Sequence, residues 1–327
     1  MNSMQDELIK TVAKLLKDHT VDLFIGYEQG TLPLQTSPCF LTAEEDAKRL
    51  VWNSLCANNL AVYLPRLMPD RSNARYKRIG VLCKGCDSRS VAGLIKEKQV
   101  ARDRVFVLGI ACPGIVDKKK IAGLMKGTEI DGVEETADEI IVNTRDSSRC
   151  FKKKELLYEC CADCTHPSPL LHDAFIGKEN AAPRAPQADA RVREFSSKER
   201  AGRWKVFEAE LSRCIRCYAC RNACPNCYCR ECFAEETKPA WIGVTDDLSD
   251  IMFYHMGRIL HQAGRCVDCG ACVRACPMDI DLRLFTRVLV DEVQERFGYE
   301  PGLSLEESAP LATYRAEDKQ EFMTEPE

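Results

Sequence analysis

The sequence lacks several features that would point directly to a function. It contains no apolar run near the ~20 residues that a membrane-spanning helix needs, and its longest covers residues 105–116. Neither Gly-x-Gly-x-x-Gly nor Gly-x4-Gly-Lys-Ser/Thr occurs, so the usual phosphate-binding loops are missing. The formal net charge is only −4, which gives no indication of nucleic acid or an anionic membrane as partner. Residues 1–7 are polar and acidic rather than signal-like, so we expect a cytoplasmic protein.

Cysteine, in contrast, is abundant, with 20 residues in the chain of 327. Cytosolic thiols are kept reduced, so this number favours metal binding over structural disulfides. Two runs, starting at Cys214 and Cys266, share the pattern Cys-x2-Cys-x2-Cys-x3-Cys-Pro, by which thiolates hold [4Fe–4S] clusters. In that pattern the fourth cysteine of each run ligates the other cluster. We therefore predict one cluster on Cys214, Cys217, Cys220 and Cys276, and a second on Cys266, Cys269, Cys272 and Cys224. Zinc and disulfides are the alternatives, but a zinc site usually needs only four ligands in two pairs.

The first half of the chain alternates helix and strand patterns. Apolar periodicity predicts helices over 3–17, from 43 into the 51–60 region, and over 88–98, with strands over 21–27, 78–83, 104–110 and 139–142. This alternation favours an α/β domain with a largely parallel sheet. Ligands of such domains usually bind at the carboxyl ends of the strands.

Cysteines collect in the loops that follow these predicted strands. We predict a third cluster on Cys86, Cys112, Cys161 and Cys164, with Cys83 and Cys160 as substitutes. The alternative is that these are ordinary buried thiols, because free cysteine behaves as a small hydrophobe. Cys39, Cys56 and Cys150 stand alone and are expected to be core or surface thiols.

The loop 84–89 opens a helix, and a helix N-terminus can receive a phosphate. Lys84, Ser88 and Arg89 are therefore the residues that we would assign to a flavin phosphate, although such a loop more often merely turns the chain.

The chain changes character near residue 178, where prolines and small residues indicate a linker. A capping box at Ser196 and Glu199 predicts a helix whose apolar face contains Trp204, Phe207, Leu211 and Ile215. Further helices are expected over 247–264 and 281–298. We divide the chain into an α/β domain (1–177), a linker (178–195), an all-α domain with two clusters (196–300) and a tail (301–327).

The sequence leaves the roles of several residues between the two runs and in the tail undecided. We treat His255 and His261 as structural. Cys227, Cys229 and Cys232 are extra thiols that shield a cluster, ligate a further metal or serve only structure. In the tail, residues 310–314 are expected to lie against a partner subunit or the chain's own C-terminal domain.

Three segments resemble a known family. Residues 85–89, residues 109–112 and Cys161-Ala-Asp-Cys-Thr165, followed by residues 173–177, are similar to the beta subunits of deazaflavin-reducing hydrogenase and of formate dehydrogenase. That resemblance implies an iron–sulfur cluster and commonly FAD. The C-terminal half resembles the α-helical ferredoxin domain of the small subunit of heterodisulfide reductase and of succinate dehydrogenase iron–sulfur subunits. The chain departs from the first family in carrying this module at its C-terminus.

A cluster held by four cysteines has no open coordination position, so it transfers single electrons and does not bind substrate. Two hypotheses follow. In the first, the chain relays electrons between a catalytic subunit, of formate dehydrogenase or hydrogenase type, and a flavoprotein of a heterodisulfide-reductase-like complex. In the second, it is an FAD-containing oxidoreductase subunit that itself reduces a soluble hydride carrier.

Overall fold

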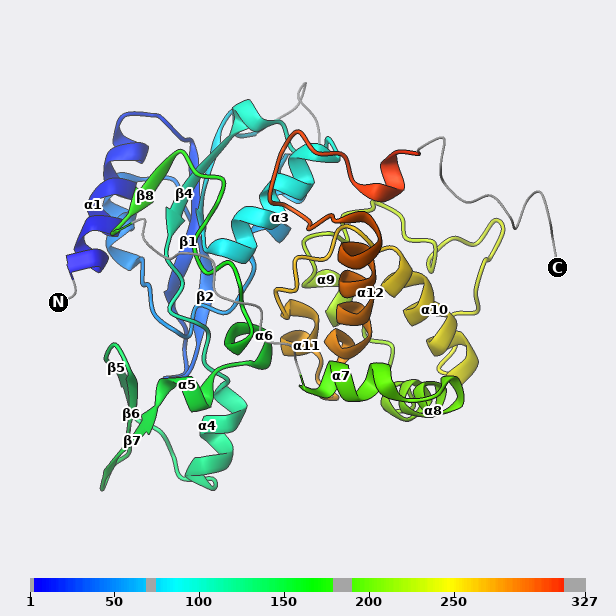
Figure 1. The fold of residues 1–327 in the computed structure, drawn as a ribbon. Helices are drawn as coiled ribbons and strands as arrows, with labels where there is room; N and C mark the ends of the chain where they lie inside the picture. The colour runs from blue at the N-terminus through cyan, green and yellow to red at the C-terminus, as the bar shows by residue number, and fades with distance from the viewer. Residues whose placement is uncertain (1–2, 69–74, 179–189, 315–327) are drawn as a thin grey trace.

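The structure is a computed structural model that describes residues 3–68, 75–178 and 190–314. An α/β part formed by the first half of the chain lies beside a helical part formed by the second half (Figure 1). The predicted fold class is confirmed. None of the helices within the described ranges combines the length and the apolar character that crossing a membrane requires.

The main sheet of the N-terminal half has the strand order β2-β1-β3-β4-β8. β1, β3, β4 and β8 are parallel, and β2 joins the edge antiparallel to β1. Every residue of β3 is buried, as expected for a strand covered on both faces. The bounds are β1 (Leu23–Gln29), β2 (Thr36–Leu41), β3 (Ile79–Cys83), β4 (Val105–Ile110) and β8 (Ala174–Ile176).

Helices cover this sheet. α1 contacts β1 and β8, and α3 contacts β3 and β4 from the side that faces the helical half (Figure 1). The helical elements of this half are α1 (Ser3–Lys17), η1 (Glu44–Arg49), η2 (Leu60–Tyr63), α2 (Leu64–Leu67), α3 (Gly85–Lys96), η3 (Arg102–Arg104), α4 (Lys118–Met125), α5 (Lys153–Leu156) and α6 (Glu159–Ala162).

One prediction in this half was wrong, and two others were confirmed as elements but differ in sheet membership or in bounds. The helix expected from residue 43 is instead a pair of short 3-10 turns, η1 and η2, separated by irregular chain. The strand predicted over 139–142 does not join the main sheet: β6 (Glu139–Asn143) pairs antiparallel with β5 (Gly132–Glu135) and β7 (Ser148–Lys152). The helix expected over 88–98 begins three residues earlier, because Gly85 already adopts helical geometry.

The helical half consists of α7 (Ala190–Ser197), α8 (Arg200–Leu211), α9 (Ala219–Asn222), α10 (Leu248–Leu260), α11 (Ala271–Ala275), α12 (Leu282–Phe297) and η4 (Pro310–Ala312). Its core packs aromatic and aliphatic side chains of α8, α10 and α12, such as Phe207, Ile251 and Phe285. The helices predicted over 247–264 and 281–298 are confirmed. Asp281 caps α12 by accepting a hydrogen bond from the Leu284 amide, and Gly298 ends it in the left-handed region.

The predicted start of this half was wrong. Ser196 is not a helix cap but lies near the end of α7, and Glu199 precedes α8 without a side-chain capping bond. Two members of the predicted apolar face are exposed: Trp204 by 51% and Ile215 by 58%. The middle of the predicted linker, residues 179–189, lies outside the described residues.

The two halves contact each other through α3. Glu97, just after α3, accepts two hydrogen bonds from Arg265 at 2.5 and 2.6 Å. Arg89 donates from Nε to the Pro301 carbonyl at 2.9 Å and pairs with Glu300. In the tail, Pro310 packs at Gly264 of the helical half, and Tyr314 is 88% exposed.

Candidate metal centres

The two cysteine runs have the same loop conformation. The second residue after the first cysteine, Arg216 or Asp268, has a positive φ, and so does the fourth, Tyr218 or Gly270. Positive φ is uncommon for residues other than glycine, so the repetition is a property of the motif. In each loop the amide of the second residue donates a hydrogen bond to the first cysteine: Arg216 to Cys214 Sγ at 3.3 Å and Asp268 to Cys266 Sγ at 3.4 Å. Such amides stabilise a negatively charged sulfur.

The structure brings the predicted ligands of the first cluster together. We call them set 1, and they line one small cavity: Cys214, Cys217, Cys220 and Cys276. The Cys220 thiol interacts electrostatically with Cys214 and Cys276, and Cys214 interacts with Cys217. Cys276 comes from the second run, so the arrangement is the one that crossed ligation requires.

The predicted ligands of the second cluster also meet. Set 2 is Cys224, Cys266, Cys269 and Cys272. Cys224, from the first run, interacts electrostatically with Cys269 and Cys272, and Cys266 interacts with the same two residues. The exchange of one cysteine between the runs is therefore symmetrical.

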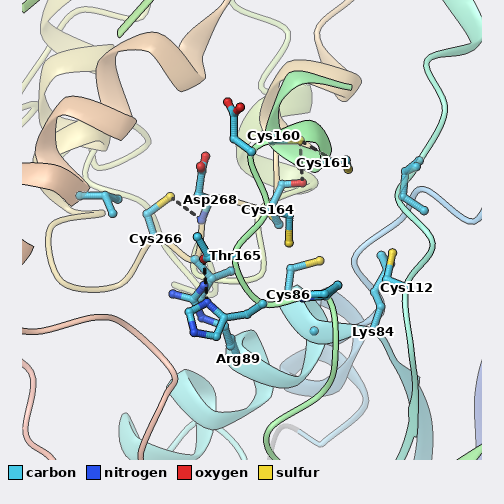
Figure 2. A pocket seen from close by; sticks show the side chains of 18 of the residues that line it. Lys84, Cys86, Arg89, Cys112, Cys160, Cys161, Cys164, Thr165, Cys266 and Asp268 are labelled. Atoms are coloured by element: carbon cyan, nitrogen blue, oxygen red, sulfur yellow. Dashed lines mark hydrogen bonds between the residues drawn. The ribbon is translucent and has the colours of Figure 1, made fainter. Parts of the chain in front are cut away.

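The predicted ligands of the third cluster lie at the carboxyl ends of β3 and β4. Set 3 is Cys86, Cys112, Cys161 and Cys164, and all four line a cavity of about 270 Å³. In Figure 2 the sulfur atoms of Cys86, Cys112 and Cys164 face one common space, and the short helix α6 that carries Cys161 borders it. Of the two substitutes, Cys160 also lines this cavity, whereas Cys83 is fully buried inside the sheet.

Close backbone contacts hold set 3 in place. The Cys112 amide donates to the Pro167 carbonyl at 3.0 Å. Gly85 lies so close to the segment before Pro167 that an added Cβ would stand 1.9 Å from the His166 carbonyl oxygen. Only glycine fits this position, because backbone atoms cannot move aside. The loops after β3 and β4 are thereby fastened to the segment that carries Cys164.

Burial raises the pKa of several thiols in the three sets. It brings the pKa of Cys112, Cys220 and Cys269 to about 11 and that of Cys272 to about 12. Without a metal these four thiols are neutral, and metal binding must displace their protons.

The donor sets suit clusters better than single ions. Among the described residues, no three His, Cys, Asp or Glu side chains converge closely enough to hold one metal ion. A [4Fe–4S] cluster takes each thiolate on a different iron, so its ligands stand further apart than those of one ion. Twelve cysteines in three all-sulfur sets therefore fit clusters of this kind.

The residues assigned to a flavin phosphate are engaged with the protein itself. Lys84 is buried and donates to Tyr27 at 2.6 Å, to the Asn58 carbonyl at 2.6 Å and to Asp87 at 2.9 Å. Ser88 exchanges hydrogen bonds with the backbone of Leu171, and Arg89 binds Glu300 and Pro301. Lys84 and Arg89 do line the cavity of set 3, so the flavin assignment stays a prediction.

Three residues near the sets were missed or undervalued by sequence reasoning. His255 is buried, and its Nε2 lies 3.4 Å from Cys214 Sγ. Burial, followed by the charges of Arg258 and Arg216, lowers the pKa of His255 to about 3, so the ring is neutral and can donate to this sulfur. Arg258 and Arg274 lie among the cysteines of two sets. Arg274 lies inside the second cysteine run, so the sequence could have indicated it. Arg258 and His255 lie on α10, and only the folded structure shows that this helix is near the cysteines.

The cysteines not yet described differ in their exposure and in their contacts. Cys39 and Cys56 are buried and Cys150 is exposed. Cys227, Cys229 and Cys232 line a second cavity together with His261. Cys227 accepts a hydrogen bond from Gln262 Nε2 at 3.6 Å, and a hydrogen bond with Cys224 lowers its pKa.

Comparison with protein-family models gives a match in the helical half. Residues 210–280 match the family model of the 4Fe-4S dicluster domain. The helical half therefore contains a dicluster domain.

The chain as a whole is similar to two curated proteins. It is 24% identical over 352 residues to F420-dependent formate dehydrogenase subunit beta from Methanocaldococcus jannaschii, covering 88% of this chain and 89% of that protein. It is also 24% identical over 359 residues to F420-dependent formate dehydrogenase 1 subunit beta from Methanococcus maripaludis, covering 91% and 90%. The predicted resemblance to these beta subunits is confirmed.

Among solved structures, a chain of the xenon-derivatised F420-reducing [NiFe] hydrogenase complex from Methanosarcina barkeri matches with a TM-score of 0.38 and 17% identity. The match covers 50% of this chain and 59% of that chain. A TM-score this low does not support a shared fold.

Proposed function

We propose that this chain is an iron–sulfur electron-transfer subunit that holds three [4Fe–4S] clusters in a row and passes single electrons along them. The observation that carries the proposal is that thiols of neighbouring sets lie close enough to interact electrostatically. Cys220 of set 1 interacts electrostatically with Cys272 of set 2, and Cys269 of set 2 interacts with Cys86 of set 3. In this proposal the domain 196–300 holds the first two clusters, the domain 1–177 holds the third, and 178–195 links them.

The residues present support electron transfer rather than substrate chemistry. Each set offers four thiolates, which supply all the protein ligands that such a cluster takes, and the bound cluster contributes one-electron redox chemistry. The protein supplies amide donors to the sulfurs of Cys214 and Cys266, and it buries Cys220 and Cys276. These features tune a potential without adding an acid, a base or a nucleophile.

The names of the relatives indicate the type of complex. Because the similar proteins are formate dehydrogenase beta subunits, we infer that a catalytic subunit of formate dehydrogenase or hydrogenase type exchanges electrons with this chain. A flavoprotein of a heterodisulfide-reductase-like complex is the proposed partner at the other end of the relay. The tail, residues 301–327, is a candidate for one of these contacts.

Cluster content tests the proposal directly. The full chain, purified anaerobically, is expected to contain about 12 iron and about 12 sulfide per molecule, because each cluster holds four of each. Zinc without sulfide would contradict clusters of any kind. About 8 of each would remove the third cluster while leaving the dicluster domain intact.

A second candidate function is an FAD-containing subunit that reduces a soluble hydride carrier. The relatives are named F420-dependent, and the cavity of set 3 offers space beside the proposed third cluster. Acid extraction of the purified chain followed by flavin fluorescence separates the two functions. Stoichiometric FAD, together with reduction of a deazaflavin by the isolated chain, would favour the second; a flavin-free protein would favour the relay.

A further inference from the structure

One buried arginine stands between set 1 and set 2. Arg258 of α10 is 4% exposed, and its Nη2 donates to the Cys220 carbonyl at 3.1 Å. Its Nε and Nη1 are buried with no hydrogen-bond partner in the described structure. Leaving charged donors unpaired in a protein interior is costly, so this arrangement needs an anionic partner.

The thiols around Arg258 show where that partner belongs. Arg258 lines one cavity together with Cys224 and Cys227, next to the Cys220 carbonyl that it binds. Cys220 belongs to set 1, whereas Cys224 belongs to set 2. The guanidinium is therefore shared between the two sets.

A second arginine lies between set 2 and set 3, as Arg258 lies between set 1 and set 2. Arg274 of α11 donates from Nη1 to the Cys269 carbonyl at 2.7 Å and from Nη2 to the Ala57 carbonyl at 2.8 Å. Its Nη1 also lies 3.8 Å from Cys160 Sγ. Arg274 lines one cavity together with Cys269 of set 2 and with Cys86 and Cys161 of set 3.

These two arginines differ from the other cations near the cysteines. Arg283 and Arg287 both bind Asp268, Arg89 binds Glu300, and Lys84 binds Asp87. Arg216, beside set 1, is directed to Tyr218 and the Thr245 carbonyl. Among the described residues, the hydrogen bonds of Arg258 and Arg274 go to backbone carbonyls and sulfur. Their charge is thus left for the sets that flank them.

We propose that Arg258 and Arg274 are the charge-compensating bridges of the relay, each setting the potentials of the two clusters between which it stands. This inference rests on the proposed three-cluster function. Bound clusters would exchange single electrons, one being oxidised as its neighbour is reduced. A cation beside both would stabilise the reduced form of either cluster, so it would raise both neighbouring potentials. Arg258 acts on the clusters of sets 1 and 2, and Arg274 on those of sets 2 and 3.

The test is a redox titration of the full chain followed by electron paramagnetic resonance. Iron and sulfide are measured first, because a wild-type protein without three clusters contradicts the proposed function and not this inference. Arg258→Gln is expected to shift the midpoint potentials of clusters 1 and 2 to more negative values and to leave cluster 3 unchanged. Arg274→Gln is expected to shift clusters 2 and 3 and to leave cluster 1 unchanged. Signals are assigned with Cys217→Ser, Cys272→Ser and Cys164→Ser, each of which alters one cluster.

Arg213→Gln is the matched control. Arg213 directly precedes Cys214 but is half-exposed and pairs with Glu210, so its removal is expected to leave all three potentials unchanged. Equal shifts of all three clusters in either Gln variant, or no shift, would overturn the proposal.

Lysine variants keep the proposal testable if a Gln variant loses iron. The ammonium of Arg258→Lys or Arg274→Lys is a compact charge that cannot span two clusters as the guanidinium fork does. At least one of the two flanking potentials is therefore expected to become more negative, with the third unchanged. A fully loaded Lys variant with both flanking potentials at wild-type values would contradict the bridging role.

Discussion

At the scale of single residues, the N-terminal half contains a buried ion pair beneath set 3. Lys84 and Asp87 are 1% and 0% exposed at the side chain and lie 2.9 Å apart, with the Tyr27 hydroxyl against both. Burial raises the pKa of Asp87 while Lys84 acts against it. Removing one partner of such a pair leaves an uncompensated charge in the interior.

Asp87→Asn is therefore expected to destabilise the protein by about 3–5 kcal/mol, measured as the shift of the denaturant midpoint under anaerobic conditions. Glu44→Gln, which removes the exposed pair with Lys17, is the control and should leave the midpoint in place. A midpoint for Asp87→Asn equal to that of the control would mean that the Asp87 carboxylate does not stabilise the buried charge of Lys84.

Cys224 is the residue on which crossed ligation depends. It lies in the first run, yet its thiol interacts electrostatically with Cys269 and Cys272 of the second as well as with nearby Cys227. Cys224→Ser is expected to perturb the cluster of set 2 and to leave that of set 1 intact, as resolved by paramagnetic resonance. Cys150→Ser, at an exposed position outside all sets, should change neither. Loss of the set 1 signal instead would show that each run serves its own cluster.

At the scale of elements, the start of α3 connects the sheet to set 3. Gly85 is the first residue of this helix and contacts the His166 carbonyl, whereas Gly93, two turns on, has nothing within 4 Å of an added Cβ. The same substitution is thus expected to have opposite results at two positions of one helix.

Gly85→Ala is expected to push the 166–167 segment away and to lower the iron content by about 4 per molecule, because set 3 loses its geometry. Gly93→Ala should keep full iron and gain up to about 1 kcal/mol from better helix propensity. Iron analysis of both variants, with circular dichroism to confirm folding, decides the matter. Full iron in a folded Gly85→Ala protein would speak against a third cluster on these cysteines.

At the scale of the whole molecule, the three sets form a continuous series from the loops of the α/β half to the helical half. A relay of this kind requires a redox partner close to each end. Native purification from the host is expected to recover a large catalytic subunit together with a flavoprotein. The isolated chain should reduce artificial dyes only when that catalytic subunit supplies electrons. Formate oxidation by the isolated chain at enzyme-like rates, on the order of 1–10³ per second, would contradict the relay.

The sequence by itself determined the elements whose signals are local. The spacing within each cysteine run, the amphipathic pattern of α1 and α12, and the apolar runs of β3 and β4 are all readable within a few residues. Local signals failed where short segments depend on distant partners. β2 contains Pro38 and exists as an edge strand against β1, and β8 is three residues long. Neither has a pattern that predicts a strand.

Only the tertiary structure decided how the sets lie relative to one another and what stands between them. Cys86 of set 3 and Cys269 of set 2 are 183 positions apart in the chain, so no spacing rule relates them. The sequence also does not predict the place of Arg258, because its helix has an ordinary amphipathic pattern. Arg258 is buried among thiols of both runs because α10 packs on the two cysteine loops. Such long-range packing depends on complementary surfaces, which local periodicity does not encode.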